Sequence, residues 1–234
     1  MKQLMKYRII SGQHIEERTA HIDLAGAGQP RGRKTGKSPA SQLARNEAQA
    51  VRTLAREFHC NCGHDWQFLT LNYEKGAVPR SAREGEQRIK NFIRRLSRAY
   101  RKQQGEKLVY FWSNGEYNTK TGEPCPLHHH FLLPYIPLEV IADNWPDGPV
   151  TARSMEGGAD YFELARYLIR NAGYGKGRRA WKSSLGNKKP VRTPPVPVNQ
   201  LADARREAEQ ENQERRPNHG KRASGAVPED TAGV

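Results

Sequence analysis

Three consecutive histidines open a short apolar run in PLHHHFLLPY, residues 126–135. Side chains alternate between the two faces of a β-strand, so His128 and His130 would point to one side and His129 to the other. Two imidazoles that converge on one face can bind a divalent metal ion. A cluster of solvent-facing or hydrogen-bonded histidines without a ligand is the alternative interpretation.

A second candidate group lies on DYFELARYLIRNAG, residues 160–173. The apolar residues recur at helical spacing, with Asp160 as the expected N-cap and Gly173 as the expected stop. At about 100° per residue, Tyr161 lies within the apolar stripe, whereas Tyr167 lies on the polar side with Arg170 one turn along. The pattern predicts an accessible Tyr167 hydroxyl, and an ordinary surface tyrosine is the alternative.

Basic residues follow this helix in GYGKGRRAWKSSLGNKKPVR, residues 173–192, which has no acidic residue. Glycines combined with lysine and arginine suit a loop that wraps a phosphate backbone, although such runs also occur as solvated surface. Together with an earlier RGRK segment, the run supplies the expected nucleic-acid-binding residues: Arg31, Arg33, Lys34, Lys176, Arg178, Arg179, Trp181 and Lys182.

The overall charge agrees with a polyanionic partner. The 39 lysines and arginines exceed the 25 aspartates and glutamates and give a net charge of +14, which favours nucleic acid over a membrane. No segment has the pattern of a signal peptide or a membrane span, so we expect a soluble intracellular protein. Cys60 and Cys62 are expected to be free thiols, with a zinc site as the weaker alternative.

Composition divides the chain into three parts. We expect a basic flexible N-terminal arm over residues 1–41, a folded domain over residues 42–190 and a disordered charged tail over residues 191–234. Periodicity within the domain predicts strands over 66–73 and 107–114 with a basic amphipathic helix between them. A turn-rich segment then predicts an antiparallel return along 127–135, followed by the helix over 160–173.

The order of these elements carries a family resemblance. The segments FLTLNY, NFIRRLSRAYRK, VYFWSNGEY, HHHFLL and ARYLIRN resemble rolling-circle replication initiators of the His-hydrophobic-His (HUH) endonuclease class, and most of all those related to filamentous-phage gene II protein. In that class a strand supplies two metal-binding histidines, and a later helix supplies a nucleophilic tyrosine followed three residues on by a lysine. The resemblance implies an α+β fold of ferredoxin-like or RNA-recognition-motif-like type, with a central antiparallel sheet and helices on one face.

The resemblance also implies roles for individual residues. His128 and His130 would bind Mn²⁺ or Mg²⁺ with Glu116 as third ligand, Tyr167 would be the nucleophile, and Arg170 stands where the family has lysine. The chain departs from the family at His129, where a bulky hydrophobic residue is normal. A register that uses Leu127 and His129 therefore stays an alternative, as does participation of Tyr174.

The activity implied is the nicking and joining of single-stranded DNA at a phage or plasmid replication origin, through a covalent 5′-phosphotyrosine. The expected location is the cytoplasm of a bacterial host. A host helicase and polymerase are expected partners, because the sequence has no P-loop motif. A non-catalytic single-stranded DNA- or RNA-binding protein and a conjugative relaxase are the alternatives.

Overall fold

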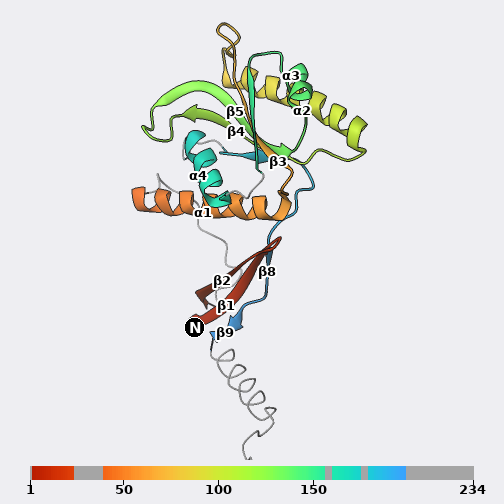
Figure 1. Cartoon of the computed structure of the whole chain (residues 1–234). Helices are drawn as coiled ribbons and strands as arrows, with labels where there is room; N and C mark the ends of the chain where they lie inside the picture. Colours follow the sequence, from red (N-terminus) through yellow and green to blue (C-terminus); the bar gives the residue numbers. More distant parts are fainter. Residues whose placement is uncertain (1, 24–38, 156–159, 175–178, 199–234) are drawn as a thin grey trace, which may run out of the picture. The chain divides into compact units, whose positions relative to one another are not determined.

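The computed structural model describes residues 2–23, 39–155, 160–174 and 179–198 (Figure 1). The chain divides into two compact units, of which the larger comprises Arg8–Glu17 and Gln29–Thr193 and holds all the described candidate site residues. The smaller unit comprises Met1–Tyr7, Arg18–Gly28 and Pro194–Val234. Within the described ranges, no helix has both the length and the apolar character needed to cross a membrane.

A five-stranded antiparallel sheet forms the centre of the larger unit. The strand order is β6-β3-β5-β4-β7, so that β5 lies in the middle between β3 and β4. The apolar residues Phe131, Leu132 and Leu133 follow one another along β5, as expected for a strand that is covered on both faces. The strands are β3 (Trp66–Leu71), β4 (Phe111–Tyr117), β5 (Pro124–Pro134), β6 (Val150–Ser154) and β7 (Lys182–Ser183).

Four helices pack on this sheet, two on each face (Figure 1). On one face, α1 (Ala40–Asn61) and α4 (Tyr161–Asn171) bury a cluster that includes Phe58, Phe111 and Leu168. On the other face, α2 (Ala82–Gln104) and α3 (Leu138–Asn144) bury a cluster that includes Phe92, Phe131 and Trp145. The predicted α+β class is confirmed, whereas the expected placement of helices on one face is wrong. Both faces of β5 are apolar, and each therefore requires cover.

Local sequence signals account for the ends of α4. The Asp160 carboxylate accepts hydrogen bonds from the backbone N–H groups of Phe162 and Glu163, at 2.9 and 3.0 Å, which confirms the predicted N-cap. Past the end of the helix, Gly173 has a φ of 67°, a left-handed conformation that favours glycine. A side chain there would also collide with the ring of Tyr117. The helix that carries Tyr167 is therefore fixed at both ends.

The chain termini differ from the sequence predictions. Strands β1 (Lys2–Ser11) and β2 (His14–Asp23) form a hairpin within the segment expected to be a flexible arm. Two short strands from the expected tail, β8 (Val191–Arg192) and β9 (Val196–Pro197), pair antiparallel with β1. These pairings join residues more than 180 positions apart in sequence, for example Ile9 with Arg192, and composition does not report such partners. Residues 24–38 and 199–234 of the expected arm and tail lie outside the described residues.

Candidate metal and nucleophile site

His128 and His130 lie on the face of β5 that α4 covers. In the sheet register, His130 is opposite Thr70 on β3 and Ser113 on β4, and His128 is opposite Gly115. The two Nε2 atoms are 3.1 Å apart. Strand alternation therefore brings these imidazoles together, as the sequence predicts.

The hydrogen bond of His128 determines which of its ring nitrogens is free. His128 Nδ1 lies 2.9 Å from the backbone carbonyl oxygen of Pro126, which can only accept, so Nδ1 carries the hydrogen and donates it. In a neutral imidazole the lone pair is then on Nε2, the atom that faces His130. A histidine whose second nitrogen donates to a carbonyl oxygen is oriented as metal ligands usually are.

His130 is surrounded by more polar atoms than its ring can satisfy. Its Nε2 lies 2.9 Å from Asn171 Oδ1, 3.1 Å from His128 Nε2 and 3.2 Å from Tyr167 Oη. One ring nitrogen carries at most one hydrogen and cannot pair with three neighbours. Its Nδ1 lies 3.1 Å from Thr70 Oγ1, a partner that would hold the ring with Nε2 directed at this cluster. Such crowding of donor atoms is the arrangement that a cation between them would satisfy.

Burial keeps the His130 ring neutral. Only 2% of the residue is exposed, and desolvation, followed by the neighbouring His128, lowers the pKa of His130 to about 4. A neutral imidazole is the form that binds a metal ion. At neutral pH the pair is therefore in the state that ligation requires.

His129 occupies the opposite face and has a different environment. The Asn114 amide nitrogen donates to Glu116 at 3.3 Å, which directs the Asn114 oxygen toward His129 Nδ1 at 2.9 Å. His129 Nδ1 therefore donates, and Nε2 accepts from the Tyr73 hydroxyl at 2.8 Å. Both ring nitrogens are used, and burial lowers the pKa of His129 to about 3. The alternative register based on Leu127 and His129 would thus have a single imidazole without a free lone pair.

Tyr167 extends from α4 toward the histidine pair. The residue is 37% exposed, and its hydroxyl is the atom 3.2 Å from His130 Nε2. The rings of Phe68 and His130 lie against it, with centroids at 6.3 and 5.2 Å. Burial raises the pKa of Tyr167, so its oxygen stays protonated at neutral pH until a cation or a base assists.

The other tyrosines of this region lie elsewhere. Tyr161 packs into the apolar cluster against Phe58 and His59, as helical projection predicts, and burial raises its pKa to about 12. Tyr174 follows the end of α4 and lines a separate hollow with Arg170 and Glu47. Tyr167 is therefore the one of these three whose hydroxyl contacts the histidine pair.

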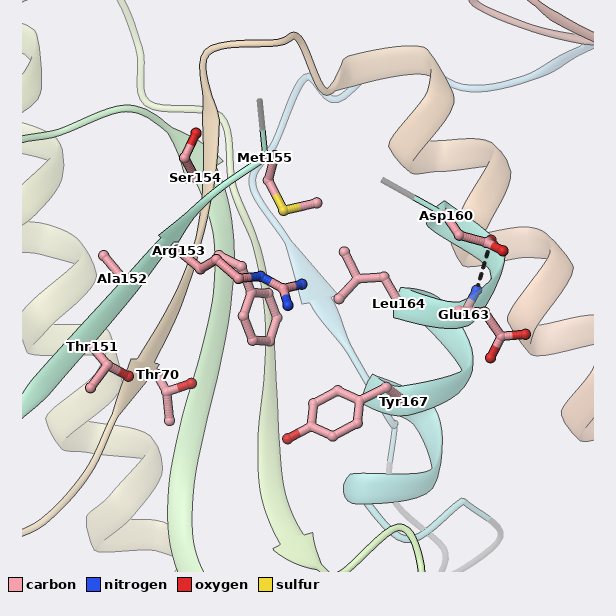
Figure 2. A pocket seen from close by; sticks show the side chains of 11 residues that line it. Thr70, Thr151, Ala152, Arg153, Ser154, Met155, Asp160, Glu163, Leu164 and Tyr167 are labelled. Atoms are coloured by element: carbon pink, nitrogen blue, oxygen red, sulfur yellow. Dashed lines mark hydrogen bonds between the residues drawn. The ribbon is translucent and has the colours of Figure 1, made fainter. Parts of the chain in front are cut away.

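A cavity of about 820 Å³ opens beside Tyr167, between β6 and α4. Figure 2 shows Tyr167 directing its hydroxyl from α4 toward the sheet, and Arg153 reaching from β6 toward Leu164. The lining also includes the Phe68 ring and the hydroxyl groups of Thr70 and Thr151. A volume in this range, with a cation, an aromatic face and hydroxyl groups, can receive a nucleotide-sized ligand.

Two residues expected at the site point elsewhere. Arg170 Nε donates to Glu47 on α1 at 3.0 Å, and no contact with Tyr167 is observed among the described hydrogen bonds. Glu116 accepts from Asn114 and thereby belongs to the hydrogen-bonded group around His129. The structure therefore brings together His128, His130 and Tyr167, and does not bring Glu116 or Arg170 to them.

The expected nucleic-acid-binding residues are divided. Arg179 is exposed, whereas Trp181 packs against the cluster under α1 and α4. Lys182 pairs with Glu86 at 2.7 Å and lies over the Trp112 ring at 5.0 Å. The remaining members lie outside the described residues: Arg31, Arg33, Lys34, Lys176 and Arg178.

Sequence reasoning missed Asn171, Thr70 and Gly115. Asn171 follows Tyr167 by four residues, a spacing that puts both on one side of a helix and could have been noticed. Gly115 interrupts a strand, which often marks a close approach of another group. In the described part of the chain, no three His, Cys, Asp or Glu side chains gather as a metal site, and Cys60, Cys62 and Cys125 are free.

Comparison with known proteins agrees with this geometry. No curated protein and no solved structure matches the chain. A family model described as replication-associated protein of the ORF2 type matches residues 66–172, the segment that runs from β3 through α4. The matched segment contains every residue of the histidine and tyrosine cluster. This match supports a replication initiator family for the chain.

Proposed function

We propose that the protein nicks and rejoins single-stranded DNA at a replication origin, and that it does so through a covalent 5′-phosphotyrosine on Tyr167. Rolling-circle replication of a phage or plasmid would begin at that nick. The observation that carries this proposal is the 3.2 Å approach of Tyr167 Oη to His130 Nε2, beside the second imidazole of His128. A hydroxyl nucleophile next to two neutral imidazoles can attack a phosphodiester held by a cation.

The residues present fit a divalent metal ion. His128 presents a lone pair on Nε2, and His130 would do so when Thr70 Oγ1 accepts its Nδ1 hydrogen. Gly115 leaves open the space that a side chain would fill against His128 Nε2. Imidazole and oxygen donors together suit Mn²⁺ or Mg²⁺. When bound, such an ion would polarise the scissile phosphate and lower the pKa of a nearby hydroxyl.

The transfer step follows from the position of Tyr167. Its hydroxyl loses a proton, the oxygen bonds to phosphorus, and the bond from phosphorus to the 3′ oxygen breaks. The departing 3′ oxygen takes up a proton and becomes the hydroxyl that primes synthesis. One phosphodiester replaces another, so the reverse attack by a 3′ hydroxyl rejoins the strand without further energy.

Surrounding groups would hold the DNA. Arg153 and the Phe68 ring in the adjoining cavity can contact a phosphate and a base next to the nick. Arg170 would serve the scissile phosphate only after leaving Glu47. Arg179 and the basic residues of the arm and loop would add salt-dependent backbone contacts. A host helicase and polymerase in the bacterial cytoplasm would complete replication.

Covalent trapping tests the proposal directly. The full chain is incubated with Mn²⁺ and a pool of end-labelled randomised single-stranded oligonucleotides, and adducts are resolved by denaturing electrophoresis. We expect a labelled adduct whose tryptic peptide carries the nucleotide on Tyr167. DNA binding without any adduct, for any oligonucleotide or divalent metal, would instead favour a non-catalytic binding protein.

A further inference from the structure

We propose that Asn171 is the third donor of the metal site formed by His128 and His130, in place of Glu116. This inference rests on the proposed function and specifies its metal site. It assigns the third ligand to the same helix that carries the nucleophile. Four observations support it, and they concern the orientation of the amide, the space above Gly115, the position of Glu116 and the spacing along α4.

The Asn171 amide has a fixed orientation. The residue is 3% exposed, and its Nδ2 donates a hydrogen bond to the backbone carbonyl oxygen of Tyr117. Because a carbonyl oxygen only accepts, the nitrogen must face Tyr117 and the oxygen must face the other way. That oxygen lies 2.9 Å from His130 Nε2. A buried amide oxygen is thus held against the imidazole pair.

Gly115 keeps open a space beside the same two groups. A Cβ at this position would stand 2.1 Å from His128 Nε2 and 2.3 Å from Asn171 Oδ1, closer than any real Cβ contact. The imidazole nitrogen and the amide oxygen therefore flank one point on the sheet that only glycine leaves free. His130 Nε2 is 3.1 Å from the first of these atoms and 2.9 Å from the second. Three donor atoms from β5 and α4 converge there.

Glu116 lies in a different group. It accepts from Asn114, whose oxygen accepts from His129 on the opposite face of the sheet. It also lines the hollow that contains Trp112 and Lys182, whereas Tyr167 lines the cavity between β6 and α4. A Glu116 carboxylate would have to change sides of the sheet to reach the His128 and His130 nitrogens.

The identity of the donor has chemical consequences. Two imidazoles and an amide are all neutral, so the bound ion would keep its full charge of two and attract a phosphate more strongly than a carboxylate-ligated ion. The ion would be bound less tightly than with an acidic ligand. Asn171 follows Tyr167 by one helical turn, so the same ligand would set the distance between ion and attacking oxygen.

Mn²⁺ binding to the full chain tests the assignment without relying on activity. Binding is measured by titration calorimetry and by the electron paramagnetic resonance signal of free Mn²⁺, for the wild type, Asn171→Ala, Asn171→Asp and Glu116→Gln. We expect Asn171→Ala to weaken Mn²⁺ binding by at least about tenfold and Asn171→Asp to strengthen it, since a carboxylate adds charge. Glu116→Gln is the matched control and should leave the affinity unchanged.

The outcomes separate this inference from the proposed function. If the wild type binds Mn²⁺ and forms the adduct, but Asn171→Ala binds Mn²⁺ equally well and Glu116→Gln does not, the third ligand is Glu116 and only this inference fails. If the wild type neither binds Mn²⁺ nor forms an adduct, the proposed function fails with it. Should Asn171→Ala not fold by circular dichroism, Asn171→Asp decides, because unchanged affinity in that variant overturns the assignment.

Discussion

His129 and His130 are neighbours in sequence, yet they lie on opposite faces of β5 in opposite situations. Both are almost fully buried, at 1% and 2% exposure, and burial lowers the pKa of each. His129 has one partner for each ring nitrogen, namely Asn114 and Tyr73. His130 has three polar atoms around a single nitrogen.

The difference separates a structural histidine from a candidate ligand. Around His129, each donor meets one acceptor, so nothing further is needed and the group holds β3, β4 and β5 together. Around His130, the hydrogen bonds available cannot satisfy the atoms present, and a cavity adjoins the cluster through Tyr167. Burial and a lowered pKa are common to both histidines, so neither property identifies the site.

The largest expected effect comes from removing the attacking oxygen on the His130 face. Tyr167→Phe keeps the ring that packs on Phe68 and His130 but deletes the hydroxyl, so covalent adduct formation should fall below detection, at least about a thousandfold. DNA affinity, measured by fluorescence anisotropy, should stay within about twofold. Tyr161→Phe, in the apolar cluster, is the control, and an adduct that moves to Tyr161 would contradict the assignment.

Removing the paired imidazoles should abolish metal binding. In the double variant His128→Ala with His130→Ala, two of the converging donors are lost, and calorimetry should detect no Mn²⁺ binding and gels no nicking. Binding to single-stranded DNA without metal should persist, because the basic residues are untouched. Loss of Mn²⁺ binding on changing His129 alone, in a variant that stays folded, would instead support the alternative register.

A substitution on the other face should affect stability rather than metal binding. His129→Ala leaves a cavity and removes the partners of the Tyr73 hydroxyl and the Asn114 oxygen, so the free energy of unfolding should fall by about 3 kcal/mol. Urea denaturation followed by tryptophan fluorescence measures the change. At low urea the folded fraction should still bind Mn²⁺ with wild-type affinity. A loss of less than about 1 kcal/mol would mean that this hydrogen-bonded group is not structural.

The smallest expected effect is on the pH dependence of stability. The pKa of His129 is about 3 in the folded chain against about 6.5 when unfolded, so below pH 6.5 the unfolded chain binds a proton that the folded chain does not. Stability should therefore decrease as the pH falls from 6.5 toward 3, by up to about 1.4 kcal/mol per pH unit for one histidine, and should not change from this cause above 6.5. His129→Leu should reduce that slope in metal-free buffer.

The exposed His64 supplies the control for that measurement, and His64→Leu should leave the slope as in the wild type. His130, with a pKa of about 4, should contribute a second proton over a similar range and keep part of the slope in His129→Leu. An identical slope in wild type and His129→Leu would show that His129 does not carry this dependence.

Much of the local structure follows from the sequence alone. The spacing of PLHHHFLLPY determined that His128 and His130 share a face, because side chains alternate along any strand. Helical periodicity determined that Tyr161 is buried and Tyr167 accessible, and Asp160 determined where α4 begins. These are properties of a single element, and the residues that decide them are near neighbours in the chain.

The tertiary structure decided which faces meet. That α4 packs on the His128 and His130 side of β5, with Asn171 against the imidazoles, depends on how two apolar surfaces fit together across 41 residues of chain. The same packing paired Arg170 with Glu47, directed Glu116 toward Asn114, and joined β1 to β8. Periodicity assigns a side chain to a face of its own element, but burial energy does not depend on direction along the sequence, so the partner of that face is set only when the whole core is packed.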